Sequence, residues 1–259
     1  MKQAQRRIFL IKSLLKEQSQ YKEIGIPQDV AAQKQLLRSL LNVRRPGNIS
    51  DEFLAVQDEY LLEETAAKGI TGLADLSPIA DGLYLWQGDI TTLLCDAIVN
   101  AANSGLTGCY IPCHRCIDNC IHTYAGVQLR LACAEIMAEQ GHEEGTGLAK
   151  ITPAYNLPSK YVIHTVGPII YDQVTAKDRA LLASCYRSCL ELAKQNGLKS
   201  IAFCCISTGE FHFPNDEAAE IAVRTVKEFK EQTGSDMEVV FNVFKDHDAE
   251  IYRTLLEKC

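Results

Sequence analysis

The sequence predicts an α/β protein, in which helices cover a layered sheet, preceded by a separate helical segment. From about residue 80 onward, short apolar runs alternate with longer runs at helical spacing, which is the pattern of a layered α/β sheet. The first 75 residues show helical spacing instead. At 259 residues, the chain is long enough to bury a substantial core in one large domain with an extension.

The N-terminal segment is expected to form three helices. In the first, apolar side chains recur at Ile8, Leu10, Ile11, Leu14 and Leu15. A second helix begins near Pro27 and ends at the break over residues 45–47, and Ser50 is suited to cap the third. Because short amphipathic helices are marginal in water on their own, we expect residues 1–75 to dock on the remainder, residues 76–259.

The remainder is expected to supply the strands of the sheet and its covering helices. Strand-like runs lie at residues 83–86, 97–99, 149–151, 162–165, 201–206 and 239–243. Helical runs lie near residues 117–140, 177–196, 215–233 and 248–257. The sequence contains no internal repeat and no low-complexity segment.

Composition and charge limit the classes of partner that the protein could bind. Hydrophobic residues make up 47% and charged residues 23% of the chain, as in an ordinary globular protein. The formal net charge of −7 argues against non-specific binding to nucleic acid or to an anionic membrane. No stretch approaches the roughly 20 apolar residues of a membrane span, and Lys12 and Lys16 interrupt the N-terminal apolar runs, unlike in a signal peptide. We therefore expect a cytoplasmic protein.

Cysteines and histidines are concentrated in residues 100–126. This segment holds four of the eleven cysteines and two of the six histidines, between a predicted strand and a predicted helix. Thiols stay reduced in the cytosol, and thiolates and imidazoles in one loop are typical ligands of transition metals. Open α/β sheets keep their ligands at the ends of strands. The segment therefore predicts a metal site that takes part in chemistry.

The candidate metal ligands are Cys109, Cys113, His114, Cys116, Cys120 and His122. Zinc hydrolases commonly hold the ion with three protein ligands and leave one position open. His114 and Cys116 are two residues apart and can face one side of an extended segment, and Cys109 can complete the set from the other arm of the loop. Cys113 is a rival ligand because it forms a C-x-x-C pair with Cys116.

Other roles for these residues are also considered. A redox C-x-x-C pair needs a thioredoxin-like context, which is absent, and haem attachment needs a histidine where Ile117 stands. A closed structural site with four ligands stays an alternative. Cys120 and His122 are expected to face helix packing, and His164, inside an apolar strand, is expected to be a satisfied core histidine. Cysteines in apolar runs, which are expected in the core, are Cys95, Cys133, Cys185, Cys189, Cys204 and Cys205.

Residues 206–214 (ISTGEFHFP) follow a predicted strand and lead into a predicted helix. The backbone N–H groups of residues 207–209 can bind a pyrophosphate, helped by the helix dipole. Pro214 suits the first turn of the helix. The alternative is a plain strand-to-helix turn without a ligand.

Four segments in this order and spacing resemble a macrodomain, the ADP-ribose-binding α/β/α fold: residues 87–91 (QGDIT), 100–103 (NAAN), 161–168 (YVIHTVGP) and 206–214. The resemblance covers about residues 80–258 and implies three layers around a mixed central sheet. With its metal loop and helical extension, the chain resembles the zinc-dependent macrodomains of bacteria and fungi. In these, a metal loop (residues 104–118 here) replaces the glycine-rich loop, and the ligand set is Cys-His-Cys. This implies one zinc ion held by Cys109, His114 and Cys116, with Cys113 still a rival.

The resemblance also implies which residues bind and act on ADP-ribose. Asn103 would orient the distal ribose hydroxyls, because an amide supplies both donor and acceptor. Asp118 would lie beside the scissile carbon as base or positioner, although its position equally suits a helix N-cap. The residues implied to bind ADP-ribose are Asp89, Ile90, Asn103, Cys120, Ser207, Thr208, Gly209, Glu210, Phe211 and Phe244.

Some of these residues could have other roles, and some differ from the residues that the family pattern has. Asp89 would accept the adenine amino proton and Ile90 would make a backbone contact, although an Asp here also suits a turn. Phe244 would stack on adenine, with core packing as its alternative. Glu210 stands where the family has an apolar residue, so its carboxylate must point away from the pyrophosphate. Asn119 replaces a glycine, which changes how closely the backbone approaches the phosphate.

The resemblance implies a zinc-dependent protein mono-ADP-ribosyl hydrolase that releases ADP-ribose. It further implies a lipoyl-carrier protein as the modified substrate and a sirtuin-type transferase as the antagonist. The alternative is a non-catalytic ADP-ribose reader with a structural zinc. A zinc module that contacts RNA is disfavoured by the acidic charge and by the lack of a basic, aromatic-laced stripe. We expect residues 1–75 to dock without binding the ligand directly.

Overall fold

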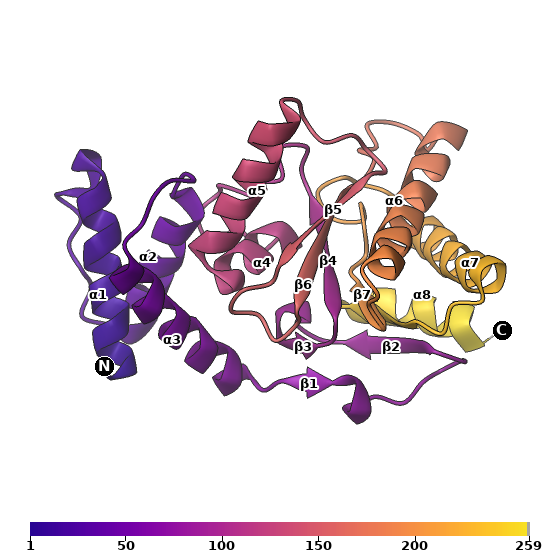
Figure 1. The fold of residues 1–259 in the computed structure, drawn as a ribbon, viewed down its shortest axis with the longest axis horizontal. Coiled ribbons are helices and arrows are strands. Elements are labelled where there is room, and N and C mark those ends of the chain that lie inside the picture. The colour runs from indigo at the N-terminus through magenta and orange to yellow at the C-terminus, as the bar shows by residue number, and fades with distance from the viewer. Residues whose placement is uncertain (258–259) are drawn as a thin grey trace.

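A mixed sheet with helices on both faces forms the centre of the protein (Figure 1). The structure is a computed structural model that describes residues 1–257; Lys258 and Cys259 lie outside the described residues. The strand order is β2 (Leu83–Gln87), β8 (Glu238–Val243), β7 (Ser200–Phe203), β4 (Ala97–Ala102), β6 (Tyr161–Val166) and β5 (Ala149–Pro153). Neighbouring strands run parallel except at the edge, where β5 is antiparallel to β6.

Two groups of helices complete the three layers. On one side lie α4 (Ile117–Ala125) and α5 (Val127–Gln140). On the other side α6 (Ala176–Gln195), α7 (Asn215–Thr233) and α8 (Asp246–Glu257) pack side by side. The strands β4 and β7 are buried almost throughout, as expected of strands covered on both faces. The predicted α/β/α architecture with a mixed sheet is therefore confirmed.

The predicted helix over residues 117–140 is wrong in one respect, because it is two helices separated by Gly126. This glycine has φ +97°, a left-handed conformation that favours glycine. A Cβ there would lie 2.6 Å from Nε2 of Gln57 on the N-terminal extension. The chain therefore bends where the extension packs closely against it.

Short elements complete the chain. A two-strand parallel pair, β1 (Thr71–Gly72) with β3 (Leu93–Leu94), was not predicted, because two residues are too few to show a periodic pattern. The 3₁₀ helices are η1 (Ser19–Tyr21), η2 (Leu73–Asp75) and η3 (Ile90–Thr92). Strand β7 ends at Phe203, so residues 204–206 already belong to the loop that follows.

The N-terminal segment forms the three predicted helices, α1 (Gln3–Glu17), α2 (Val30–Val43) and α3 (Asp51–Lys68), at one end of the molecule (Figure 1). The Ser50 hydroxyl caps α3 by accepting a hydrogen bond from Phe53 N at 3.2 Å, as predicted. The apolar faces form their own core, which contains Leu10, Ile11, Leu14, Leu37, Leu40, Leu41, Phe53, Val56, Tyr60 and Leu61. Val127 at the start of α5 joins this core.

Polar contacts fix the extension against the sheet domain. Gln57 Oε1 accepts a hydrogen bond from Val127 N at 3.0 Å, and Asn156 Nδ2 donates to Asp58 Oδ1 at 2.7 Å. Arg130 Nη1 donates to carbonyls at the C-terminal end of α2, including that of Asn42 at 2.9 Å. These contacts hold the three helices against the rest of the chain, and the division into an extension and a domain at residues 75/76 stays a prediction.

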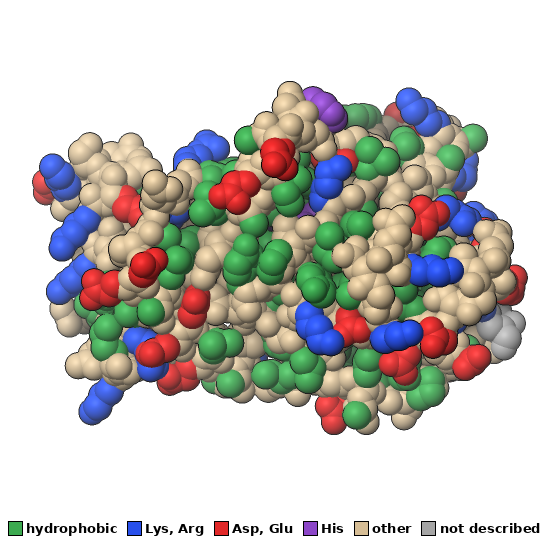
Figure 2. All heavy atoms as spheres, in the orientation of Figure 1, with side chains coloured by type: hydrophobic (Ala, Val, Ile, Leu, Met, Phe, Trp, Pro, Cys, Tyr) green, Lys and Arg blue, Asp and Glu red, His purple; other side chains and the backbone are tan. Residues whose placement is uncertain are grey.

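Charges of both signs cover the visible face of the molecule. Figure 2 shows Lys and Arg side chains interspersed with Asp and Glu, and not gathered into a stripe on that face. Among residues 1–257, no helix is long and apolar enough to cross a membrane.

Candidate functional site

The predicted site residues gather at one edge of the sheet. Asp89 follows β2, Asn103 follows β4, the loop over residues 204–214 follows β7, and Phe244 follows β8. Because these strands are mutually parallel neighbours, their carboxyl ends meet at the same edge. This is where open α/β sheets bind their ligands.

Cys109, His114 and Cys116 form a compact cluster in the loop between β4 and α4. Their ligand atoms all lie within 4.8 Å of one another. Cys109 Sγ is 3.6 Å from His114 Nδ1. A tetrahedral zinc ion, with bonds of about 2.3 Å to sulfur and about 2.0 Å to nitrogen, would hold these atoms roughly 3.5 Å apart. The three side chains therefore fit a transition-metal ion, and among the described residues this group supplies three ligands, which leaves a position open.

Cys113 points away from this cluster toward α2. Its Sγ lies 3.2 Å from the Ser39 hydroxyl, and its backbone N–H donates to Asn42 Oδ1 at 2.9 Å. Its φ of +55° is unusual for a residue with a side chain. The structure thus brings Cys109, and not the C-x-x-C partner Cys113, to His114 and Cys116.

The surroundings of Cys116 and His114 affect how they could bind a metal. Burial raises the pKa of the Cys116 thiol to about 12, and the neighbouring Cys109 adds to this rise. Because a thiol binds metal as the thiolate, metal binding must release this proton. His114 Nε2 lies 3.5 Å from Oε1 of Glu210, so Nδ1 is left to face Cys109. A carboxylate next to the distal ring nitrogen is the usual partner of a metal-binding histidine.

Asn119 fastens the metal loop to the start of α4. Its buried side-chain amide donates to the carbonyls of Cys109 at 3.3 Å and Ile111 at 3.0 Å. Asn119 therefore ties the loop between β4 and α4 to the first turn of that helix.

Asp118 and Asn103, the two predicted catalytic residues, lie together. Asn103 Nδ2 is 3.4 Å from Asp118 Oδ2, and Asn100 Nδ2 donates to Asp118 Oδ1 at 2.8 Å. Burial raises the pKa of Asp118 to about 6, against the lowering effects of the Asn100 hydrogen bond and the Arg130 charge. This carboxyl can therefore take up and release a proton near neutral pH.

The helix-cap alternative for Asp118 is wrong. The cap of α4 is Cys116, whose Sγ accepts a hydrogen bond from Asn119 N at 3.4 Å, and Asp118 lies inside the first turn. Its carboxylate is thus free of the capping role.

A buried polar group lies behind Asp118. His164 on β6 is fully buried, with Asn100 Nδ2 3.1 Å from its Nδ1 and the Thr152 hydroxyl 3.0 Å from its Nε2. The prediction of a satisfied core histidine is confirmed. His122 and Cys133 also lie near His164 and could in principle form a second metal group. However, Asn100 donates to the His164 Nδ1 lone pair, which leaves the proton on Nε2, so His164 is a poor ligand.

The cysteines outside the metal loop lie where predicted. Those fully or mostly enclosed in the core are Cys95, Cys133, Cys185, Cys189 and Cys204. Cys205 is half-buried and packs against the same core.

Asp89 is held by residues on both sides of its carboxylate. Oδ1 accepts hydrogen bonds from the backbone and hydroxyl of Thr91, and Oδ2 is 3.0 Å from Nζ of Lys68 on α3. Burial by itself would raise the pKa of Asp89, but the Thr91 hydrogen bonds and the Lys68 charge outweigh it and lower the pKa. The Lys68 ammonium also lies over the Tyr124 ring. The extension therefore contacts the predicted adenine acceptor.

The loop after β7 has a strained, tightly packed beginning. Ser207 has φ +66° and is buried. A Cβ on Gly167 would lie only 2.0 Å from the Ser207 hydroxyl oxygen. Glycine at position 167 is thus needed for this loop to take its shape. Pro214 is the N-cap of α7 and precedes its first turn, one position earlier than predicted.

The remaining predicted ADP-ribose contacts differ in exposure. Ile90 is buried, Cys120 is partly buried, and the Phe211 carbonyl accepts a hydrogen bond from Ile170 N at 2.8 Å. Phe244 is 76% exposed, so the alternative that it packs in the core is wrong. Its ring is accessible for stacking.

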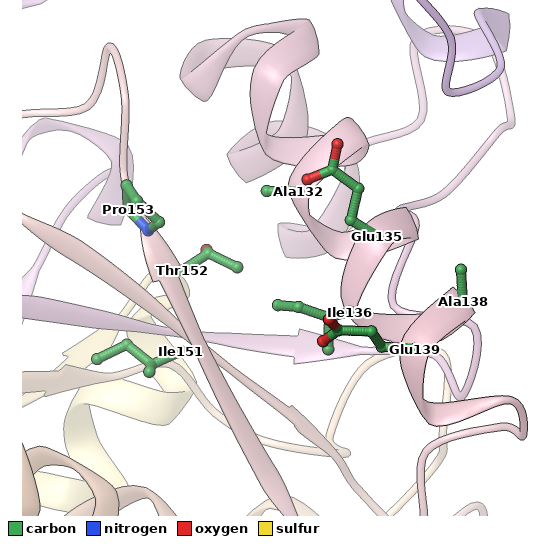
Figure 3. A pocket seen from close by; sticks show the side chains of 8 residues that line it. All are labelled: Ala132, Glu135, Ile136, Ala138, Glu139, Ile151, Thr152 and Pro153. Carbon is green, nitrogen blue, oxygen red and sulfur yellow. The ribbon is translucent and has the colours of Figure 1, made fainter.

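A separate cavity of about 730 Å³ lies between α5 and β5 (Figure 3). Its walls are Ala132, Glu135, Ile136, Ala138, Glu139, Ile151, Thr152 and Pro153. These residues include none of the predicted site residues, so the cavity is distinct from the site at the strand ends.

The fold and this site define a three-layer α/β/α ligand-binding domain. The macro domain family model matches residues 99–222. A protein-ADP-ribose hydrolase of Treponema medium is 62% identical, covering 99% of this chain and 100% of that protein. One of Staphylococcus aureus (strain MRSA252) is 53% identical, covering 95% and 92%. The chain belongs to the macrodomain family.

Solved macrodomain structures agree with this assignment. The Oceanobacillus iheyensis macrodomain with ADP is 40% identical with a TM-score of 0.63, covering 71% of this chain and 97% of that one. The Trypanosoma brucei macrodomain in complex with ADP-ribose is 29% identical with a TM-score of 0.66, covering 85% and 94%.

Proposed function

We propose that the protein is a zinc-dependent hydrolase that removes mono-ADP-ribose from modified protein side chains and releases ADP-ribose. The observation that carries this proposal is the Cys109–His114–Cys116 cluster next to the Asn103–Asp118 pair. The names of its relatives from Treponema medium and Staphylococcus aureus, both protein-ADP-ribose hydrolases, support it.

Zinc is the proposed ion because two thiolates and one imidazole suit it, and three protein ligands are typical of catalytic zinc. When bound, the ion would supply Lewis acidity at the reacting centre. Asn103 would hold the distal ribose hydroxyls, since its amide donates and accepts. Asp118 would hold a proton or accept one beside the bond between the ribose C1″ and the modified side chain.

The rest of the nucleotide would lie along the strand ends. Asp89 and Ile90 would bind adenine, with Phe244 stacked on it and Cys120 beside it. The pyrophosphate would bind the backbone of Ser207, Thr208, Gly209, Glu210 and Phe211. The exposed Phe244 ring and the strained Ser207 backbone support this placement. The proposed affinity therefore comes mainly from groups remote from C1″.

The family resemblance extends the proposal to a lipoyl-carrier protein as substrate and a sirtuin-type transferase as antagonist. We also propose a cytoplasmic location. The described cysteines are all free thiols, which supports a reducing compartment.

The test is a release assay on a mono-ADP-ribosylated protein, run with the native, chelated and zinc-restored enzyme, beside calorimetry with ADP-ribose. Because groups at C1″ act mainly in the transition state, Asn103→Ala, Asp118→Ala and metal removal should each lower turnover by roughly a hundredfold or more. ADP-ribose affinity should change much less. Equal losses in rate and affinity would instead support a reader with a structural zinc. Release by the metal-free enzyme at the native rate would also contradict the proposal.

A further inference from the structure

We infer that helix α2 of the N-terminal extension is part of the metal centre, and that Arg38 is a positioning residue that holds the metal loop in its ligand geometry. This inference rests on the metal site of the proposed function. It assigns to residues 1–75 a role in metal affinity, beyond docking.

Arg38 connects three parts of the site through one nitrogen. Its Nη2 donates to the backbone carbonyl of the ligand His114 at 2.7 Å. The same nitrogen donates to Asn119 Oδ1 at 3.1 Å and lies 3.5 Å from Cys120 Sγ. Because Asn119 in turn binds the Cys109 carbonyl, the guanidinium fixes the backbone at one ligand directly and at a second through one intermediate.

Two further residues of α2 hold the middle of the loop. The Ser39 hydroxyl contacts Cys113 Sγ, and Asn42 Oδ1 accepts the Cys113 N–H. Cys113 directly precedes His114 and has a left-handed backbone, a conformation that persists when surrounding contacts enforce it. Asn42 Nδ2 also donates to Thr123 on α4 at 2.8 Å, so α2 bonds the loop and the helix after it together.

A stacked aromatic side chain holds the other arm of the loop. Tyr110, next to the ligand Cys109, contacts two guanidinium groups, with Arg45 at 4.2 Å and Arg130 at 4.5 Å from its ring centroid. Arg45 follows the C-terminal end of α2, and Arg130 binds the carbonyls at that end. Both arms of the loop therefore depend on the extension.

These contacts matter for affinity because the loop has no helix or strand of its own between β4 and α4. Ordering such a segment costs backbone conformational entropy at every residue. If α2 already holds the loop, metal binding need not supply that ordering free energy, which is the advantage of preorganisation. Partners outside the ligand set typically contribute about 10- to 100-fold to metal affinity.

The experiment measures zinc affinity of the full-length, metal-free protein by competition with a chromophoric chelator. Arg38→Met should raise the zinc dissociation constant by about 10- to 100-fold. Arg38→Lys, which keeps a donor for the His114 carbonyl, should recover part of this loss. The control is Arg6→Met, because Arg6 ties α1 to Glu59 and Glu63 on α3 without contacting the metal loop.

Thermal unfolding of the same metal-free proteins separates positioning from stability. A native-like zinc dissociation constant in Arg38→Met would overturn the inference while leaving the proposed metal site intact. So would an equal loss of affinity in Arg6→Met, since the effect would then follow from general destabilisation. If Arg38→Met does not fold, the zinc dissociation constants of Arg38→Lys and Ser39→Ala are compared with that of the native protein instead. Native-like values in both variants would overturn the inference. A native protein that binds no zinc would refute the proposed metal site itself.

Discussion

The imidazole Nε2 of His114 lies 3.5 Å from the carboxylate Oε1 of Glu210. This contact joins the metal loop after β4 to the loop after β7, the proposed pyrophosphate site. Glu210 was expected to point away from the pyrophosphate, and its proximity to His114 gives a physical reason for a carboxylate at this position. Because Glu210 is 69% exposed, we expect it to orient the ring and to add little to stability.

Removal of any one proposed ligand should abolish stoichiometric zinc binding. We expect about one zinc per native chain, and loss of it in Cys109→Ser, His114→Ala and Cys116→Ser, because each supplies one of three ligands. Elemental analysis of the purified proteins measures this. Cys113→Ser is the matched control and should keep its zinc, since Cys113 faces α2. Zinc loss in Cys113→Ser alone would move the site to the C-x-x-C pair.

Asp89→Ala should weaken ADP-ribose binding by about 1–3 kcal/mol, because the adenine amino group would lose its acceptor. Calorimetry measures the affinity. Lys68→Met is the matched variant, since it removes the ion pair at 3.0 Å and keeps the acceptor, and should bind within about threefold of the native protein. Unchanged affinity in Asp89→Ala would show that the adenine site is elsewhere. A loss in Lys68→Met as large as in Asp89→Ala would place the extension in the ligand site.

Gly167→Ala should impair ADP-ribose binding through the loop after β7. The added methyl group would overlap the Ser207 hydroxyl, and a tightly packed site cannot absorb it without moving the loop. We expect at least a tenfold loss of affinity, about 1.4 kcal/mol, in the same calorimetric assay. Gly47→Ala, at a position where a Cβ meets nothing within 4 Å, should bind like the native protein. Native affinity in Gly167→Ala would separate the pyrophosphate site from this loop.

Stability should fall as the pH drops below about 6.5, in part because of His164. Burial lowers the pKa of His164 from 6.5 to about 3, so the unfolded state binds a proton that the folded state does not. Stability from this group is therefore complete above pH 6.5 and is lost as the pH falls toward 3, by about 1.4 kcal/mol per pH unit. Urea denaturation between pH 7 and pH 5 checks this. His164→Gln should show a shallower decline, and an equal decline in both proteins would contradict the prediction.

Local patterns predicted most of the fold. The helix over residues 215–233 was predicted at its observed bounds, and the Ser50 cap was correct, because both depend on residues close in sequence. The break at Gly126 was missed because a single glycine is tolerated within a helix, and the close approach of Gln57, far away in sequence, is visible only in the fold. The possible cap at Asp118 was wrong for a local reason, because the cap lies two residues earlier at Cys116, and cysteine is not a usual cap residue.

The candidate site shows the same contrast between residues close in sequence and contacts made only in the fold. Cys109, His114 and Cys116 fall within eight residues of one another, so the sequence suggested a metal site there, although spacing alone left Cys113 as a rival ligand. Arg38 lies 81 residues from Asn119, and no periodicity or motif in α2 connects the two. Asn100 was part of a noted motif, yet its bond to Asp118 depends on how α4 packs over β4. The sequence therefore suggested the proposed metal ligands, whereas the residues that hold them in place could be recognised only from the fold.

The hydrogen bonds from Arg130 to α2 have a consequence for the order of events during synthesis. The carbonyls they satisfy belong to Leu41, Asn42 and Arg44, which precede Arg130 by 86 to 89 residues. At about 5–20 residues per second, a ribosome needs roughly 4–18 seconds to make that stretch. Helix α3 is completed during this interval, while Arg130, the partner of the α2 carbonyls, is still unmade. These bonds between α2 and α5 can therefore form only after the metal loop, residues 104–118, has been synthesised.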